Sequence, residues 1–332
     1  MPVDAPERFV VRAYEPGDET AILDLFARSF HQPLTPQAWR WRYEDNPEGG
    51  TRISVAFEND RLVAHYAGYP VALELDGEPL QANQIGDTMT DPSVRQVGRG
   101  PTSILARTAT HFYETFCEGR VAFNYGFNVS NIQKFSMRFL RAERVEPVVY
   151  RARDLRLRPF VKLSRAERWA RGISLEVLTT VSAEFDDLFR RSAHHYSFLV
   201  KRDARYVRWR YLDSPTAYHL VAIRKWRTLV GWLVFRMRED RFSLGDFFID
   251  PAHVDGLEAA IRHLTSVVPA TKIETWCPNR PVWLSNALQE LGFEVLPEPQ
   301  DLSLMCVPFA RRDAANLMRA RLFYTMGDGD LF

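Results

Sequence analysis

Cysteine is scarce in this chain of 332 residues, and long apolar runs are absent. The three cysteines, Cys117, Cys277 and Cys306, lie far apart and form neither C-x-x-C nor C-x-x-H spacing. This pattern excludes a disulfide framework and a zinc site, so we expect three buried, reduced thiols. No window approaches the roughly 18 consecutive apolar residues that a membrane-spanning helix needs.

Neither sign of charge dominates the composition. Lysine and arginine number 43 and aspartate and glutamate 42, which gives a net charge of +1. Binding to nucleic acid would therefore need a local basic patch. The opening segment MPVDAPERFVVRAY carries acidic residues and has no apolar core, unlike a secretion signal. We expect a cytoplasmic protein with no metal cofactor and no membrane partner, and we leave the oligomeric state open.

The same heptapeptide occurs twice, as WRYEDNP at 41–47 and as WRYLDSP at 209–215. A long internal period is typical of duplication. The length also favours about two domains. Trp41 and Trp209 are interpreted as core anchors, with Arg42 and Arg210 extending over them, and a role in binding substrate is the alternative.

Apolar periodicity and turn residues predict one order of elements in both halves: a strand, two helices, antiparallel strands, a helix, a strand, a helix and a strand. In the first half the predicted segments are 9–14, 19–30, 36–46, 52–92, 101–116, 121–127, 131–140 and 145–152. In the second half they are 173–181, 182–193, 202–215, 217–251, 254–267, 272–278, 282–293 and 301–309. The predicted fold class is α/β, a duplicated unit with a mixed sheet. The predicted domains are 1–150 and 173–332, joined by a connector at 151–172.

The turn after the fourth strand of the first half carries the pattern R-x-x-G-x-G, from Arg95 to Gly100. Glycines let backbone N–H groups approach an anion, and the following helix adds partial positive charge. Arg95 and Arg99 supply full charges, so we expect the loop to bind a pyrophosphate. An ordinary strand-to-helix turn is the alternative. The pattern is neither G-x-G-x-x-G nor G-x-x-x-x-G-K-[ST], which disfavours a dinucleotide or nucleoside-triphosphate loop.

The first half, residues 9–150, resembles the GNAT superfamily of acyl-CoA-dependent N-acyltransferases. The resemblance rests on VRAYEPGDETAILDLF, on TDP at a strand end, on R-x-x-G-x-G before a helix and on YGFNVSN before another. Residues 173–309 are similar by element order, as in tandem members of the superfamily. The resemblance implies acetyl-CoA or another acyl-CoA as co-substrate. It also implies that strand 85–90 pairs with the pantetheine. The implied coenzyme-binding residues are Met89, Thr90, Arg95, Gln96, Val97, Gly98, Arg99, Gly100 and Asn131.

The second half lacks this loop. Its corresponding residues 251–257 read PAHVDGL, with no arginine, one glycine and an aspartate, Asp255, that would repel phosphate. Leu291-Gly292-Phe293 is similar to the sequence that closes the last helix of the GNAT fold. We therefore expect a degenerate unit that keeps the scaffold, binds no coenzyme and helps to wall the acceptor site.

Acyl transfer needs a neutral amine, a polarised thioester carbonyl and a proton for the leaving thiolate. The resemblance implies an oxyanion donor among the backbone N–H groups near Met89 or Thr90. Asp87 is the candidate base, directly or through water, provided that burial raises its pKa from about 3.9. A structural hydrogen bond is the alternative for Asp87. His65 and His111 are further candidates for the base.

The proton donor is harder to assign. The superfamily commonly places a tyrosine on the helix after the fifth strand, and NIQKFSMRFL at 131–140 has none. Tyr125, just before this helix, and Tyr324, in the C-terminal tail, are the candidate acids.

The connector RARDLRLRPFVKLSRAERWAR at 151–171 is strongly basic. With Phe160 and Trp169 interleaved, it is a candidate nucleic-acid contact. The alternative is a solvated linker whose arginines cover buried Leu155, Leu157 and Val161, and this interpretation is favoured.

The predicted function is transfer of an acyl group from acyl-CoA to the amine of a small molecule, such as an amino sugar or amino acid, by direct attack in a ternary complex. The acidic residues Glu44, Asp45, Asp328 and Asp330 are available to attract a cationic amine. Two alternatives stay open. One is a non-catalytic acyl-CoA sensor or scaffold, and the other is an aminoacyl transferase of the Fem type, which uses aminoacyl-tRNA.

Overall fold

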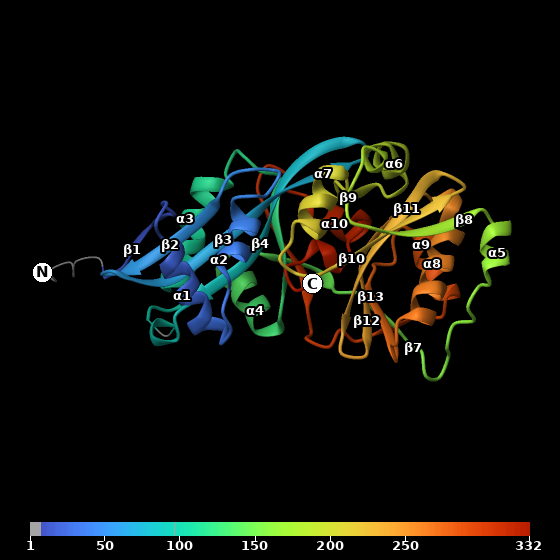
Figure 1. Cartoon of the computed structure of the whole chain (residues 1–332). Coiled ribbons are helices and arrows are strands. Elements are labelled where there is room, and N and C mark those ends of the chain that lie inside the picture. The colour runs from blue at the N-terminus through green and yellow to red at the C-terminus, as the bar shows by residue number, and fades with distance from the viewer. Residues whose placement is uncertain (1–7, 96) are drawn as a thin grey trace, which may run out of the picture. The chain divides into compact units, whose positions relative to one another are not determined.

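The computed structural model describes residues 8–95 and 97–332, without the side chain of Asn131 (Figure 1). The chain forms two compact units. Unit 1 comprises residues 1–72, 80–146 and 302–317, and unit 2 comprises residues 73–79, 147–301 and 318–332. Each unit therefore takes segments from both halves of the sequence.

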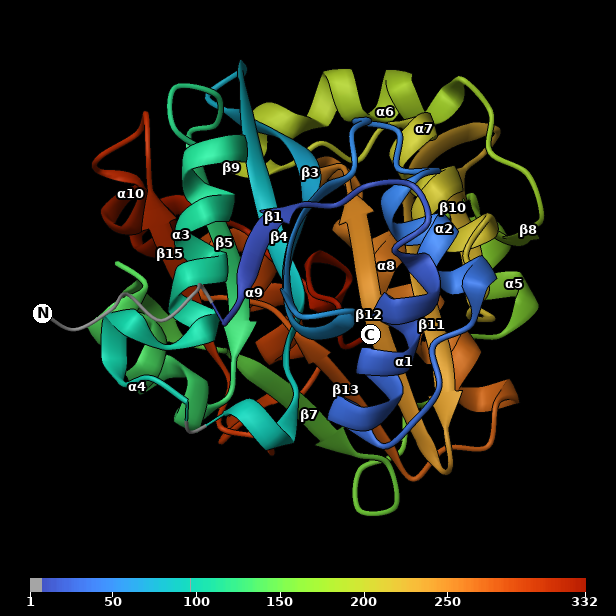
Figure 2. The same cartoon turned by 90° about the vertical axis from the view of Figure 1, so that its left-hand side faces the viewer.

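Unit 1 is built on a sheet with the order β1-β2-β3-β4-β5-β15-β6. The strands are β1 (Val10–Ala13), β2 (Arg52–Glu58), β3 (Arg61–Leu75), β4 (Glu78–Thr90), β5 (Phe123–Asn128), β15 (Ser303–Pro308) and β6 (Glu143–Pro147). The helices are α1 (Glu19–Phe30), α2 (Pro36–Tyr43), α3 (Ile104–Phe116) and α4 (Ser130–Phe139). Figure 2 shows α1 and α2 on one side of the sheet and α3 and α4 on the other.

The helices of unit 1 follow from local sequence signals. The apolar residues Ile22, Leu25 and Phe26 of α1 recur at helical spacing, and all three are buried against the sheet. Helix α2 begins at Pro36, and the Thr35 hydroxyl accepts a hydrogen bond from the Ala38 N–H at 3.1 Å. Helix α1 has the predicted bounds, and α2 begins at the predicted residue but ends at Tyr43, three residues earlier than predicted.

Unit 2 repeats the plan with the order β14-β7-β13-β12-β11-β10-β8. The strands are β14 (Glu294–Leu296), β7 (Tyr150–Asp154), β13 (Lys272–Trp276), β12 (Arg241–Ile249), β11 (Thr228–Arg238), β10 (His219–Lys225) and β8 (Ile173–Leu178). The helices are α5 (Arg165–Ala170), α6 (Glu184–Ser192), α7 (Ala204–Val207), α8 (Val254–Val267) and α9 (Val282–Glu290). Strand β9 (Phe198–Val200) pairs with residues 73–75 of β3, and α10 (Ala314–Arg321) crosses the division between the units.

The predicted duplication of a mixed α/β unit is confirmed. In each unit antiparallel strands lead to one short parallel pair. Strand β4 pairs with β5 over residues 82–84, and β12 pairs with β13 over residues 241–243. Among the described helices, none combines the length and hydrophobicity that crossing a bilayer requires.

The two sheets exchange strands, which the sequence does not reveal. The single strand predicted at 145–152 is wrong: Pro147 ends β6, in the first sheet, and β7 begins at Tyr150, in the second. The predicted last strand of the second half, seen as β15, lies in the first sheet beside β5. Strand β7 takes the equivalent place beside β13. Each unit therefore receives one inner strand from the other half.

This exchange predicts that the first half does not fold alone. A chain truncated after Glu146 lacks β15, so β5 loses a six-residue pairing, and the buried side chains of Leu304, Met305 and Cys306 are missing. We expect it to be unfolded or aggregated by circular dichroism and size-exclusion chromatography.

The matched control joins residues 302–317 to residue 146 through a flexible linker, which restores β15. This chain should show a cooperative unfolding transition. A stable fold for the chain without β15 would contradict the prediction.

Candidate functional site

The R-x-x-G-x-G loop lies between two 3₁₀ turns, η1 (Pro92–Val94) and η2 (Gly100–Thr102). Helix α3 begins only at Ile104, so the predicted helix start near Pro101 is wrong. The Ser103 hydroxyl caps α3 by accepting a hydrogen bond from the Ala106 N–H at 3.4 Å. The helix starts later because Pro101 and the two turns take up the intervening residues.

Two glycines of the loop have backbone conformations that other residues rarely adopt. The φ angles are +72° at Gly98 and +59° at Gly100. A Cβ atom at Gly98 would lie 2.5 Å from the Thr102 carbonyl oxygen, and one at Gly100 would lie 2.7 Å from the Phe139 ring. The loop is thus compact at these positions only because neither carries a side chain.

The predicted N–H donors of the loop are not equivalent. The Val97 N–H donates to the Val94 carbonyl at 2.9 Å, and the Arg99 N–H lies 3.3 Å from the Thr102 hydroxyl. Within the described part of the chain, no hydrogen bond involves the N–H of Gly98 or Gly100. Gly98 is exposed and Gly100 is half-buried, so these two N–H groups are the ones available to bind an anion.

Charge around the loop is positive, as predicted. Arg95 and Arg99 are exposed, and Arg95 is fixed by a 3.0 Å hydrogen bond from its Nε to the Thr90 carbonyl. The predicted coenzyme ligand Gln96 lies outside the described residues. Asn131 falls within α4, but its side chain is also outside them.

Unit 2 has the same turn without the loop. Asp91 and Asp250 end equivalent strands, and each carboxylate accepts a hydrogen bond, at 3.0 Å, from the N–H two residues later. In unit 2 the 3₁₀ turn η5 (Pro251–His253) leads directly into α8 at Val254. Residues 95–103 of unit 1 therefore have no counterpart in unit 2, which is why unit 2 lacks the glycine loop.

Strands β4 and β5 part soon after they meet. Their pairing ends at Gln84 and Tyr125, and residues 85–90 of β4 continue without a pairing to β5 in the described structure. The predicted oxyanion donors Met89 and Thr90 are on this stretch, where the Met89 side chain is buried. A Cβ atom at Gly126 would lie 3.1 Å from the Ile85 carbonyl oxygen, so glycine allows the close approach where the strands separate.

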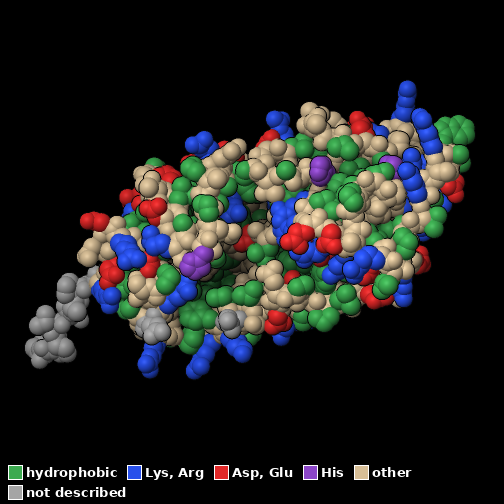
Figure 3. Space-filling view, turned by 60° about the horizontal axis from the view of Figure 1, so that its bottom comes forward, with side chains coloured by type: hydrophobic (Ala, Val, Ile, Leu, Met, Phe, Trp, Pro, Cys, Tyr) green, Lys and Arg blue, Asp and Glu red, His purple; other side chains and the backbone are tan. Residues whose placement is uncertain are grey.

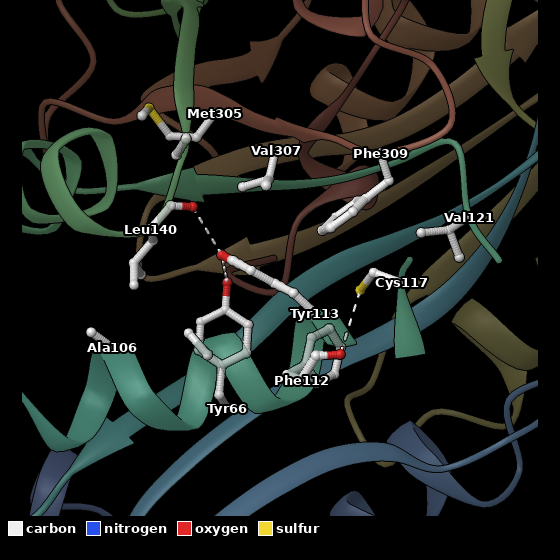
Figure 4. Close-up of a cluster of buried hydrophobic side chains, with 12 residues drawn as sticks. Tyr66, Ala106, Phe112, Tyr113, Cys117, Val121, Leu140, Met305, Val307 and Phe309 are labelled. Atoms are coloured by element: carbon white, nitrogen blue, oxygen red, sulfur yellow. Dashed lines mark hydrogen bonds between the residues drawn. The ribbon is translucent and has the colours of Figure 1, made fainter. Parts of the chain in front are cut away.

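A small cavity of ≈ 30 Å³ lies beside this separation. Its lining residues come from β3, β4, β5, α3, α4 and β15, and they include Tyr66, Ile85, Tyr113, Tyr125, Gly126 and Met305. Figure 4 shows Tyr66 and Tyr113 with their hydroxyls directed toward each other, 3.0 Å apart. The Tyr113 hydroxyl also lies 3.2 Å from the Leu140 carbonyl. The candidate acid Tyr125 is buried at this cavity.

The candidate base Asp87 is held by a network of donors. Its carboxylate accepts hydrogen bonds from Arg42 Nη1, 2.7 Å from both oxygens, from the Tyr43 hydroxyl at 2.9 Å and from the Tyr69 hydroxyl at 3.2 Å. Burial alone would raise the pKa of Asp87, but the charge and hydrogen bonds of Arg42 outweigh it and lower this pKa. The raised pKa that a base role for Asp87 requires is therefore not found, and its contacts fit the alternative of a structural hydrogen bond.

The two candidate histidines also make specific contacts. His65 Nδ1 lies 2.8 Å from the Asp87 carbonyl oxygen, and burial lowers the pKa of His65. His111 Nδ1 lies 2.9 Å from the Ser54 hydroxyl. His65 is thus next to the Asp87 network, whereas His111 links α3 to β2.

A second short repeat, on the fourth strand of each unit, contacts the repeated heptapeptide. Gly86–Pro92 and Gly245–Pro251 both read G-D-x-x-x-D-P. The Tyr211 hydroxyl donates to Asp246 at 2.6 Å, just as that of Tyr43 donates to Asp87. The repeated heptapeptide therefore supplies a tyrosine to the repeated aspartate. A search for a second repeat that follows the first in both halves would have found this relation from the sequence.

The tryptophans and arginines of the heptapeptides do not behave as predicted. Trp41 and Trp209 are only half-buried, so the prediction of core anchors is wrong. Arg42 pairs with Asp87, whereas buried Arg210 donates to the carbonyls of residues 327 and 329 at 3.1 and 3.0 Å. Both guanidinium groups turn inward because buried acceptors are within reach.

The C-terminal tail is an integral part of unit 2. The Thr325 hydroxyl donates to Asp246 at 2.8 Å, and Asp328 pairs with fully buried Arg202 at 2.6 Å. Burial and the nearby carboxylate of Asp246 raise the pKa of Asp328, which Arg202 opposes. The prediction that Asp328 is exposed to attract an amine is therefore wrong. Glu44 and Asp45 are exposed, and Asp330 is half-buried.

The candidate acid Tyr324 is buried in unit 2, where its hydroxyl accepts a hydrogen bond from the Val149 N–H at 3.1 Å. Asp87 and Tyr125 belong to unit 1. The structure thus brings Asp87, Met89, Tyr125 and the glycine loop into one unit and places Tyr324 in the other. No group of three or more metal-binding side chains occurs among the residues that the structure describes.

The aspartate networks give a prediction about stability. Asp87→Asn leaves Arg42 without a charge partner and should lower the free energy of unfolding by about 3 kcal/mol. Asp246→Asn should cost less, because Arg202 keeps Asp328 as a partner. Urea unfolding followed by circular dichroism measures both.

Asp60→Asn is the matched control, since this carboxylate is exposed on the turn between β2 and β3. It should change the free energy of unfolding by less than about 0.5 kcal/mol. An Asp87→Asn variant as stable as the wild type would show that Asp87 does not hold the fold together.

Comparisons with known proteins agree on the architecture. Residues 10–139 match the family model described as an acetyltransferase (GNAT) domain. A probable N-acyltransferase from Enterococcus faecalis is 13% identical, with a TM-score of 0.68 over 94% of this chain and 75% of its own. A GCN5-related N-acetyltransferase from Anabaena variabilis is 12% identical, with a TM-score of 0.64 over 94% and 74%.

An N-myristoyltransferase from Saccharomyces cerevisiae, solved with myristoyl-CoA, is 11% identical, with a TM-score of 0.56 over 92% of this chain and 80% of its own. No curated sequence matches at a significant level. The fold of these structures extends over nearly the whole chain, while the family model matches the part that carries the glycine loop. Residues 10–139 are thus similar to a GNAT acetyltransferase domain, and the two units together have a tandem GNAT fold.

Proposed function

We propose that the protein is an N-acyltransferase that moves an acyl group from acetyl-CoA, or another acyl-CoA, to the amine of a small molecule. The observation that carries this proposal is the glycine loop at 95–103, present in unit 1 alone and following the strand that separates from β5. The N-acyltransferases among the similar structures, one of them solved with an acyl-CoA, support it. Unit 2 serves as scaffold and binds no coenzyme.

The residues of unit 1 fit a coenzyme with a pyrophosphate and an extended arm. The N–H groups of Gly98 and Gly100, with the charges of Arg95 and Arg99, would hold the pyrophosphate. The edge of residues 85–90 that does not pair with β5 would pair with the pantetheine, as an added strand does. Gln96, Val97 and Asn131 remain proposed contacts, although the Val97 N–H already has a partner.

In the proposed reaction the amine nitrogen attacks the thioester carbonyl carbon. The carbonyl oxygen becomes negative near the N–H of Met89 or Thr90, the carbon–sulfur bond then breaks, and the thiolate takes up a proton. Tyr125 is the proposed acid, because it is buried at the cavity beside the strand separation. The attacking nitrogen loses one proton, so the overall proton count balances.

Asp87 has a positioning role in this proposal. Its φ angle of +48° marks a kink in β4 two residues before Met89, and the Arg42 and tyrosine contacts fix that kink. The lowered pKa makes Asp87 a weak proton acceptor. A base role for Asp87 stays a prediction. Loss of turnover in Asp87→Asn together with loss of the acidic limb of the pH–rate profile, measured where the variant is still folded, would favour that role.

Calorimetric titration of acetyl-CoA and of free coenzyme A tests the coenzyme site. The double variant Arg95→Glu, Arg99→Glu should weaken binding by about 100-fold or more, because two charge-assisted contacts become repulsive. Ala252→Glu, which adds a negative charge to the exposed turn of unit 2, is the matched control and should bind as the wild type does.

Release of free thiol in the presence of a panel of small amines then separates the alternatives. Binding with amine-dependent release supports the transferase. Binding without release for any amine would favour an acyl-CoA sensor. No binding to the folded wild type would overturn the proposal and direct the search to aminoacyl-tRNA, as in a Fem-type enzyme.

The two candidate acids can be distinguished by removing each hydroxyl. Tyr125→Phe should lower kcat about 100-fold with little change in coenzyme binding, and the alkaline limb of the pH–rate profile should change. Tyr324→Phe should leave the profile intact and lower stability, because the Val149 N–H loses its acceptor. The reverse pattern would assign the acid to Tyr324.

A further inference from the structure

The three most exposed large apolar side chains of the described residues, and one further exposed tryptophan, lie on the connector and on the turn between β10 and β11 of unit 2. Leu157 is 80% exposed, Val161 77%, Trp169 72% and Trp226 65%. The predicted burial of Leu157 and Val161 is wrong, because the chain leaves the sheet after buried Leu155.

Contacts join the segments that carry Val161, Trp169 and Trp226, and Leu157 lies four residues before Val161 on the same connector. Trp226, at the turn between β10 and β11, packs on Gly172, where a Cβ atom would lie 2.6 Å from the indole. The Gly172 N–H donates to the Trp169 carbonyl at 2.8 Å. The segments carrying Val161 and Trp169 both contact α8, through Arg262 over the Phe160 ring and through Arg168 at 3.2 Å from His263. Figure 1 shows α5 beside α8 and β8.

The same surface is rich in cations. Exposed Arg156, Lys162, Arg165, Arg171 and Arg227 lie on or beside these segments. Arg156 pairs with Asp154 and Arg171 with Glu258, whereas the ion pairs of the described chain leave out Lys162, Arg165 and Arg227. We name the four apolar side chains and these five cations the α5 patch. The right-hand part of Figure 3, where α5 lies, shows apolar and basic side chains together.

The charge of the α5 patch is neutralised only in part: Arg156 and Arg171 have acidic partners and α5 carries the exposed Glu167, whereas Lys162, Arg165 and Arg227 have no ion-pair partner in the described chain. Burial, together with the nearby charges of Arg168 and Lys162, lowers the pKa of His263. Solvated apolar side chains among unpaired cations cost free energy unless a partner covers them. A partner of the α5 patch must therefore be both apolar and negatively charged.

We propose that the α5 patch docks the protein onto the surface of an anionic lipid bilayer. Tryptophans favour the boundary between headgroups and acyl chains, and lysine and arginine are attracted to anionic lipids. A single-stranded nucleic acid would use the tryptophans and arginines, but aliphatic Leu157 and Val161 do not stack on bases. The exposure of these two aliphatic side chains therefore favours a bilayer over a nucleic acid as the partner. This site is separate from the coenzyme loop and does not depend on the proposed reaction.

Co-sedimentation of the full chain with vesicles tests the proposal. The protein should bind vesicles of phosphatidylcholine mixed with phosphatidylserine and should not bind vesicles of phosphatidylcholine alone. Removing two unpaired cations by Lys162→Gln, Arg165→Gln should weaken binding about 25-fold. Trp169→Ser, Trp226→Ser should weaken it at least about tenfold, and should also abolish a blue shift of tryptophan emission that vesicles cause in the wild type.

Val282→Ser is the matched control. Val282 is 65% exposed, as Trp226 is, but lies on α9. This variant should bind as the wild type does, and circular dichroism should show that every variant is folded. Failure of the wild type to bind anionic vesicles would overturn the proposal. So would unchanged binding in both double variants, or binding to a single-stranded RNA oligonucleotide in place of vesicles.

Discussion

A buried carboxylate on the fourth strand of each unit sets the constraint that the surrounding residues satisfy. Removing such a group from water costs several kcal/mol unless cations and hydroxyls replace the water. The carboxylate of Asp87 accepts hydrogen bonds from Arg42, Tyr43 and Tyr69. That of Asp246 accepts hydrogen bonds from Arg202, Tyr211 and Thr325. The repeated heptapeptide, which begins within α2 in unit 1 and in a π-helical turn (Arg208–Leu212) in unit 2, is thereby tied to the sheet at the strand that also leads to the 3₁₀ turn. The tyrosine of the heptapeptide and the aspartate of the fourth strand are thus hydrogen-bonded to each other in both units.

The segments that follow and surround this aspartate differ between the two units. In unit 1 the aspartate precedes a turn enlarged by residues 95–103, and Gly98 and Gly100 keep that loop compact with two N–H groups available. In unit 2 the turn leads directly into α8. The tail of unit 2 then packs on its aspartate: a Cβ atom at Gly245 would overlap the Phe332 ring, and Asp328 shares Arg202 with Asp246.

Local signals in the sequence predict much of this arrangement. Apolar periodicity and capping residues place α1 and α2, and the glycine pattern identifies the loop before any coordinates exist. Contacts between distant segments are not encoded locally. The exchange of β7 and β15 depends on which sheet edge each strand reaches, and nothing in 145–152 or 301–309 records that choice. The direction of the Asp87 pKa shift cannot be predicted for the same reason, because it is set by Arg42, 45 residues away in the sequence.

The connector contains apolar residues that are exposed although their hydrophobicity predicts burial. Leu155, Leu157 and Val161 have similar hydrophobicity, and sequence alone gives no reason to separate them. Leu155 follows the last residue of β7 and is buried, while Leu157 and Val161 come after the chain has turned at Asp154, whose carboxylate accepts the Arg156 N–H at 2.8 Å. That turn directs the following residues away from the sheet, so their apolar surface is left uncovered by unit 2. The burial of an apolar residue thus depends on where its backbone leaves the sheet, and a basic, apolar segment beyond that point is better interpreted as a surface for a partner than as core.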